Sequence, residues 1–140
     1  MTPAKYPLKF RRGADWHKVF THRGVAGYRA DDTPIPGAPF DLTGCTARMQ
    51  IRSDLESTIV LDTLDTENGR LVLVNRLVDL ENPLSGYVLG GIDMIFPNAV
   101  SSAYAWSDAV YDLEIIRSNG WVDCMIETSP ISLTGEVTRL

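Results

Sequence analysis

The alternation of apolar and polar residues between Gly44 and Arg52 restricts the fold of this chain more than any other feature. Apolar side chains take every second position of this segment, at Cys45, Ala47, Met49 and Ile51. A period of two places successive side chains on opposite faces of a β-strand. The segment is therefore expected to be a strand with one buried and one wet face, introduced by a turn at Asp41–Gly44.

Two Asn-Gly pairs lie between apolar runs and predict β-hairpins, because both residues tolerate a positive φ. Asn68-Gly69 separates the run Thr58–Leu64 from Arg70–Val74. Asn119-Gly120 separates Ala109–Ser118 from Trp121–Glu127.

The second hairpin carries its own prediction of register. A two-residue loop at Asn119-Gly120 sets three pairs opposite each other: Ile115 and Cys124, Leu113 and Ile126, Arg117 and Val122. This pairing gathers apolar side chains on one face, and a slip of one residue would destroy it. It also sets Asp112 opposite Glu127, a like-charge pair that costs up to about 1 kcal/mol.

Further strands are expected at Trp16–Phe20 and Tyr87–Ile92, the latter weakened by two glycines. A short helix is expected over Phe96–Tyr104, with Pro97 as its first residue. Its apolar face is predicted to hold Ala99, Val100, Ala103 and Tyr104. Many short strands separated by turns favour a mainly β fold, an antiparallel β-sandwich that is immunoglobulin-like or jelly-roll-like, with one short helix.

The length of 140 residues fits one domain, residues 1–140. Two segments stand apart from the expected sandwich. Arg23–Pro39 is rich in glycine and proline and is interpreted as a long loop projecting from the sheet, with a disordered insertion as the alternative. The C-terminal segment 131–140 has an extended character. It is either a strand that adds to another chain or an ordinary edge strand of the same domain.

Composition and charge exclude several classes of partner. The net charge of −5 argues against a large phosphate-binding face, so no nucleic-acid partner is predicted. No apolar run approaches the about 18 residues of a transmembrane helix, so no membrane partner is predicted. The first twelve residues lack the apolar core of a secretory signal. Two cysteines are too few for a disulfide framework, which favours synthesis in a reducing cytoplasm.

No set of residues predicts catalysis, a metal or a cofactor. His17 and His22 are five residues apart and would point to opposite faces of a strand, and no EF-hand spacing surrounds Asp31-Asp32. Asp62, Asp65 and Glu67 are interpreted as a solvated strand end rather than as a pair of catalytic acids. No nucleophile elbow, phosphate-binding loop or zinc-binding helix motif occurs.

The cysteines and tryptophans receive mostly structural interpretations. Cys45 and Cys124 are both placed on inward strand faces, where two thiols that act as small hydrophobes are preferred to an inter-sheet disulfide. Trp16 and Trp106 are expected in the core. Trp121 follows a turn, where a side chain is usually wet, and is predicted to take part in an interface.

Several segments together resemble a family of small tail or baseplate-associated structural proteins of tailed bacteriophages and prophages. The matching segments span nearly the whole chain: Gly13–Trp16, Asp41–Gly44 with Ala47–Arg52, Asn68–Leu71, Tyr111–Glu114 and Gly135–Arg139. Two places depart from the family. Arg23–Pro39 is longer than the turn expected there, and Glu127–Pro130 lacks the usual glycine.

The resemblance implies a structural component of the virion tail, made in the bacterial cytoplasm, without catalytic residues or cofactors. It implies other tail, baseplate or fibre proteins as partners and several copies, as a ring or other homo-oligomer. The candidate interface residues are Tyr28, Asp31, Asp32, Trp121, Val137 and Arg139. A carbohydrate-binding or host-recognition module that uses exposed tryptophans is the alternative. An enzyme has the least support.

Overall fold

The computed structural model describes residues 5–21, 23–39, 42–76 and 88–135. These residues form ten strands and one short helix. In chain order they are β1 (Leu8–Arg11), β2 (Trp16–Thr21), β3 (Arg23–Tyr28), β4 (Pro34–Pro39), β5 (Thr46–Arg52), β6 (Val60–Asp65), β7 (Leu71–Arg76), β8 (Val88–Phe96), α1 (Asn98–Ala103), β9 (Asp108–Ile116) and β10 (Val122–Thr134). The predicted mainly β fold with one short helix is confirmed.

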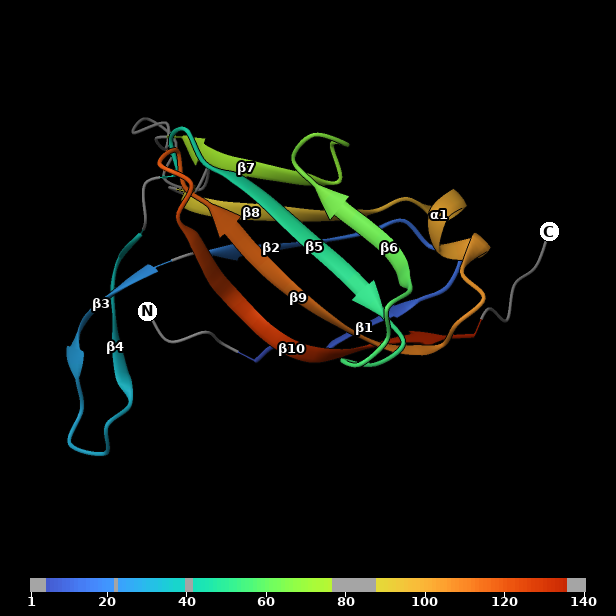
Figure 1. Ribbon diagram of the computed structural model, residues 1–140, viewed down its shortest axis with the longest axis horizontal. Coiled ribbons are helices and arrows are strands. Elements are labelled where there is room, and N and C mark those ends of the chain that lie inside the picture. Colours follow the sequence, from blue (N-terminus) through green and yellow to red (C-terminus); the bar gives the residue numbers. More distant parts are fainter. Residues whose placement is uncertain (1–4, 22, 40–41, 77–87, 136–140) are drawn as a thin grey trace.

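Two sheets form what we call the body. The first has the strand order β1-β10-β9-β5-β6 and the second the order β2-β8-β7. Strand β1 runs parallel to β10, and the other neighbours in these sheets are antiparallel. The sheets face each other across one apolar core, an arrangement consistent with a β-sandwich (Figure 1). No helix in the described part of the chain has the length and apolar character needed to span a membrane.

The alternation of apolar and polar residues between Gly44 and Arg52 is realised in β5. Ala47, Met49 and Ile51 are fully buried, while Arg48 on the other face is exposed. Strand β5 lies between β9 and β6, and Met49 is opposite Leu113 in β9. Burial of one face thus fixes the register of the centre of the larger sheet.

The β9–β10 hairpin exists, but its loop has three residues rather than two. The N–H of Arg117 donates to the carbonyl of Trp121 at 2.8 Å, and the N–H of Gly120 donates back to the carbonyl of Arg117 at 2.9 Å. Gly120 has a φ of 88°, as a three-residue hairpin loop requires at its last position. Ser118 therefore belongs to the loop, and Val122 pairs with Ile116 instead of Arg117.

This extra loop residue changes which face each side chain of β10 takes. Cys124 is opposite Glu114, not Ile115, so its predicted inward placement is wrong. Asp123 takes the inward position opposite Ile115 and is bound to Arg117 at 2.5 Å. A bulge after Cys124 then restores the predicted pairing of Leu113 with Ile126.

A second irregularity in the β9–β10 ladder lies between Ile126 and Ser129. The ladder therefore omits the predicted pairing of Asp112 with Glu127. The like-charge cost expected for that pair does not arise there. Within the described residues, Cys45 and Cys124 are half-buried and form no disulfide with each other.

The Asn68-Gly69 turn does not close a hairpin. Strand β6 pairs with β5 in one sheet and β7 pairs with β8 in the other, so the turn carries the chain between the sheets. The Asn68 side chain satisfies the local backbone: its Oδ1 accepts from the N–H groups of Asp65 at 3.1 Å and Arg70 at 3.0 Å. Its Nδ2 donates to the carbonyl of Thr63 at 2.9 Å. These bonds replace the cross-strand bonds of a hairpin.

Helix α1 is shorter than predicted and presents a different face. Pro97 is its N-cap rather than its first residue, and Ser101 is its buried residue. The Ser101 hydroxyl accepts from the N–H of Gly13 at 2.9 Å, which ties the helix to the β1–β2 turn. The N–H of Asn98 makes a second contact with this turn, to Asp15 Oδ1 at 2.7 Å. Ala99 and Ala103 of the predicted apolar face are exposed, because this helix of six residues is held by polar contacts and not by an apolar stripe.

The C-terminal part of the chain is central rather than at an edge as far as Thr134. Ile131–Thr134 belong to β10, which lies between β1 and β9, and Ile131 is fully buried. Of the two alternatives, these residues therefore serve as a strand of their own domain. The candidate interface residues Val137 and Arg139 lie outside the described residues.

Arg23–Pro39 forms a hairpin, so the prediction of a loop without regular structure is wrong. Strands β3 and β4 pair with each other in a separate two-stranded sheet that projects from one end of the body (Figure 1). We call residues 23–39 the arm. Its three prolines and three glycines suggested a loop, but proline is compatible with a strand that has a free edge.

Candidate functional site

The tip of the arm carries three of the candidate interface residues. The Tyr28 side chain is 63% exposed, and both Asp31 and Asp32 are exposed. The Asp31 carboxylate accepts hydrogen bonds from the Thr33 hydroxyl at 2.6 Å and from the Thr33 N–H at 3.1 Å. These bonds lower the pKa of Asp31. The tip is therefore an ordered turn that presents an aromatic ring and two carboxylates.

Trp121 forms a second exposed surface at the β9–β10 turn. Its side chain is 64% exposed, and the neighbouring Val122 is also exposed. The Trp121 N–H donates to Asn119 Oδ1 at 2.9 Å, which fixes the backbone of the turn. Figure 1 shows this turn at the same end of the body as the base of the arm. The other two tryptophans pack on the core as predicted; Trp16 stacks on Phe10 at 4.8 Å between ring centroids.

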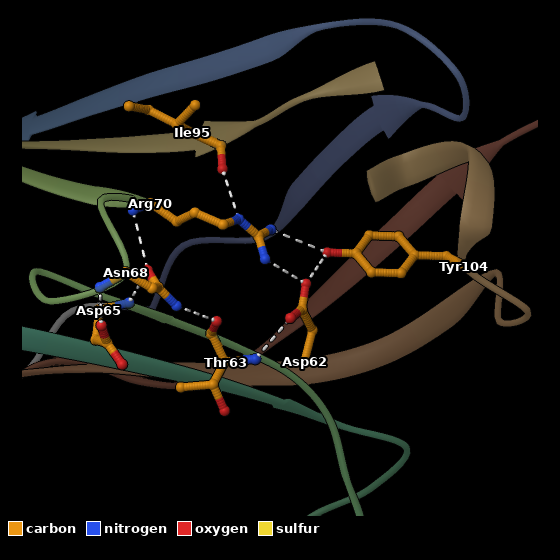
Figure 2. A network of polar contacts seen from close by, with 7 residues as sticks. All are labelled: Asp62, Thr63, Asp65, Asn68, Arg70, Ile95 and Tyr104. Atoms are coloured by element: carbon orange, nitrogen blue, oxygen red, sulfur yellow. Dashed lines mark hydrogen bonds and ion pairs between the residues drawn. The ribbon is translucent and has the colours of Figure 1, made fainter. Parts of the chain in front are cut away.

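A partly buried polar network joins the two sheets at the opposite end of the body (Figure 2). Arg70, in the turn before β7, binds Asp62 of β6 through Nη1 at 2.8 Å. Its Nη2 donates to the Tyr104 hydroxyl at 3.3 Å, and its Nε donates to the carbonyl of Ile95 at 3.3 Å. The Tyr104 hydroxyl in turn donates to Asp62. The side chains of Arg70 and Asp62 are only 16% and 20% exposed.

The electrostatics of this network favour a structural link between the sheets over a role in proton transfer. Burial, and then the hydrogen bond to Asp62, raises the pKa of Tyr104 well above its ordinary value. The phenol is therefore protonated at neutral pH and acts as a donor. The guanidinium also lies over the ring of Phe96, 5.6 Å from its centroid, so the network connects both sheets with the core.

No sequence pattern predicted this network, because its members are distant in the chain. Asp62 was expected at a solvated strand end with Asp65 and Glu67, but the three carboxylates have different environments. Asp62 holds Arg70, Asp65 accepts from the N–H of Asn68 at 2.6 Å, and Glu67 is exposed. Tyr104 lies 42 residues beyond Asp62, and no local pattern connects them.

The histidines do not form a joint site in the described structure. Nδ1 of the exposed His17 on β2 lies 3.2 Å from Oδ1 of the half-buried Asp93 on β8, and His22 lies outside the described residues. Among the residues whose positions are described, no three histidine, cysteine, aspartate or glutamate side chains are grouped as a metal ion requires. An open depression of about 410 Å³ next to His17 is lined partly by Trp16 and Phe96.

Comparison with known proteins adds no family to these observations: no family of known proteins matches the chain, and no curated protein is significantly similar to it. The functional interpretation therefore rests on the surfaces themselves and on the segments quoted above.

Proposed function

We propose that this chain is a non-enzymatic structural protein of a tailed bacteriophage virion, which acts by protein–protein assembly in the tail, baseplate or fibre-attachment region. The arm is the observation that supports this function most. It is a two-stranded hairpin outside the body, and such a hairpin is at best marginally stable in water. Docking on a neighbouring protein would supply the missing contacts. The quoted sequence segments supply the link to phage tails.

The exposed groups of the arm tip and of the β9–β10 turn are suited to such contacts. Tyr28 and Trp121 are both more than half exposed, and aromatic side chains are enriched at the centres of protein interfaces. Asp31 and Asp32 add charge, which sets the register and the choice of partner more than the affinity. In this proposal several copies bind tail, baseplate or fibre proteins.

Particle incorporation tests this function. Particles made by a phage or prophage that encodes the chain are purified and their proteins are quantified by mass spectrometry. We expect the chain in fixed stoichiometry, and we expect Tyr28→Ala combined with Asp31→Ala to lower its incorporation by about tenfold or more. Leu55→Ala is the control, because Leu55 is an exposed apolar residue outside the arm, between β5 and β6.

Two results would contradict the proposal. Absence of the chain from purified particles would reject a mature virion component. Equal loss of incorporation in the Leu55→Ala control would show that the arm tip has no special part in assembly.

The exposure of Trp121 also favours the second candidate, a carbohydrate-binding or host-recognition surface. An indole ring that is 64% exposed offers an apolar face for stacking on a sugar. Titration of tryptophan fluorescence with host surface glycans checks this function. A saturable change that disappears in Trp121→Ala would support it, and a flat response would reject it.

A further inference from the structure

The prolines of β4 determine which edge of the arm can pair with a further strand. In the β3–β4 ladder, Pro34 is opposite Tyr28, Pro36 opposite Val25 and Pro39 opposite Arg23. Opposite residues of an antiparallel pair either exchange two hydrogen bonds or turn their backbone groups away from each other. Proline has no N–H to exchange. All three prolines therefore occupy pairs of the second kind.

The turn of the arm agrees with this alternation. The N–H of Arg29 donates to the carbonyl of Thr33 at 2.8 Å, so these two residues face each other with their hydrogen-bonding groups. The next pair, Tyr28 and Pro34, must then turn its backbone groups outward.

The two edges of the arm consequently differ. At each of the three outward-facing proline positions, the outer edge of β4 lacks a donor, which prevents a further strand from pairing there. On β3, the partners of these prolines, Arg23, Val25 and Tyr28, direct their backbone N–H and C=O groups away from β4. No strand of the described residues pairs with this side of β3. The arm is thus closed along β4 and open along β3.

The open edge has an irregular spacing. The register shifts between Val25 and Gly27, so outward donors occur at Val25 and Tyr28, three residues apart. A regular strand presents its donors at every second residue. A strand with the same irregularity is another copy of β3. Antiparallel pairing of two copies places Val25 of each strand opposite Tyr28 of the other, so that donors and acceptors match twice.

We propose that two copies of this chain associate through the open edges of β3, and that their arms form a four-stranded sheet in the order β4-β3-β3-β4. Such a sheet exceeds the two strands that are marginal alone. A two-fold axis between the β3 strands makes the contact isologous, and the prolines at both outer edges end the sheet after four strands. The product is a closed dimer and not a fibre.

This inference rests on the assembly function proposed above and names its first partner, a second copy of the chain. Self-association of the purified chain is independent of particle incorporation. Monomeric protein that still needs its arm tip for incorporation would overturn the dimer and leave the assembly function standing.

Sedimentation equilibrium of the purified full chain tests the dimer. We expect a reversible dimer for the natural sequence. Val25→Pro removes one outward N–H from each β3 strand and no bond within the arm, and we expect it to weaken dimerisation by about tenfold or more. Val25→Ala is the matched control, because it keeps the N–H, and we expect a dimer that retains most of its affinity. Pro36→Ala restores a donor on β4, and we expect species larger than a dimer.

Amide hydrogen exchange gives a second readout that does not depend on the proline variant folding correctly. In the natural sequence the N–H groups of Val25 and Tyr28 should be slow to exchange at high protein concentration and fast at low concentration. Exchange that is fast at every concentration would overturn the proposal. Monomeric natural protein at about 100 μM, or a Val25→Pro variant that dimerises as tightly as Val25→Ala, would also overturn it.

Discussion

The body and the arm are both built from β-strands but are stabilised in different ways. In the body, each sheet covers the apolar face of the other, and residues such as Phe96, Met49 and Leu113 are fully buried. The arm is a separate two-stranded sheet with an exposed tip, where Asp31 adds side-chain hydrogen bonds to Thr33. Backbone pairing alone is marginal in water, and burial of apolar surface supplies most of the stability of a fold.

The difference between body and arm indicates where a substitution can be made without unfolding the protein. A side chain in the core contacts several strands, so its loss is felt by both sheets. At the arm tip, by contrast, the side chains of Tyr28, Asp31 and Asp32 are exposed. We therefore expect substitutions in the body to change stability and substitutions in the arm to change association.

The largest expected effect comes from an aromatic residue of the body. Phe96→Ala removes a ring that lies 4.7 Å from Phe10 and 5.7 Å from Trp16 between centroids, and should lower the free energy of unfolding by about 3–5 kcal/mol. Tyr28→Ala in the arm should change it by no more than about 0.5 kcal/mol. Urea unfolding measures both. Similar losses in the two variants would remove the distinction between body and arm.

The next largest expected effect is a difference in coupling energy between two ion pairs of the body. Arg70 and Asp62 are mostly buried and tie the sheets together, whereas Arg48 is 53% exposed in its pair with Glu114, at 2.7 Å. A double-mutant cycle with alanine should give a coupling of about 2 kcal/mol for Arg70–Asp62. The exposed pair should give about 0.5 kcal/mol or less, because solvent screens it. Equal couplings would mean that the network adds nothing specific between the sheets.

The sequence predicted those parts of the body in which one face of a strand is buried. The pattern in β5 survives in the structure because Met49 and Ile51 have a single face on which to be buried. The β9–β10 turn was predicted at its true place, but the inclusion of Ser118 in the loop was not. That single residue moved Cys124 to the outer face, which shows how strongly register depends on loop length.

The arm and the inter-sheet network were not predictable in the same way. Glycine and proline in Arg23–Pro39 weaken any strand pattern, and only the pairing shows that the prolines occupy outward positions. Asn68-Gly69 looked like a hairpin because the bonds of the Asn68 side chain to the backbone cannot be read from the sequence. Tyr104 meets Asp62 only after the sheets have packed.

An alkaline titration extends the comparison to the network of the body. Burial and the hydrogen bond to Asp62 raise the pKa of Tyr104 above its ordinary value of about 10. The folded state therefore keeps the phenol proton at a pH at which the unfolded chain loses it. The contribution of this bound proton to the free energy of unfolding is complete below about pH 10. Above that pH the free energy of unfolding falls by about 1.4 kcal/mol per pH unit.

Urea unfolding between about pH 9 and 11 gives the free energy of unfolding as a function of pH. Tyr104→Phe should remove the part of its slope that comes from Tyr104. Tyr111, whose pKa burial also raises, should keep a remaining slope in this variant. An unchanged slope in Tyr104→Phe would show that the phenol does not hold its proton in the folded protein.

The smallest expected effect comes from two carboxyl groups with opposite pKa shifts, Asp112 in the body and Asp31 in the arm. In the body, burial and then the charge of Glu114 raise the pKa of Asp112. This group favours folding while it is protonated, and that contribution is lost as the pH rises through its folded pKa. Asp112→Asn should therefore stabilise the protein at pH 7, by less than about 1 kcal/mol, and the gain should vanish in acid.

In the arm the pKa of the carboxyl group is shifted in the opposite direction. The hydroxyl and the N–H of Thr33 lower the pKa of Asp31, so its contribution is present above the ordinary value of about 3.9 and is lost as the pH falls through the folded value. An NMR titration of the carboxyl carbons should place the midpoint of Asp112 above that value and the midpoint of Asp31 below it. Thr33→Ala should raise the midpoint of Asp31 and leave that of Asp112 in place, because the tip and the body do not share these contacts. A change at both carboxyls would show that the arm tip is coupled to the body, which would contradict the distinction drawn between the two regions.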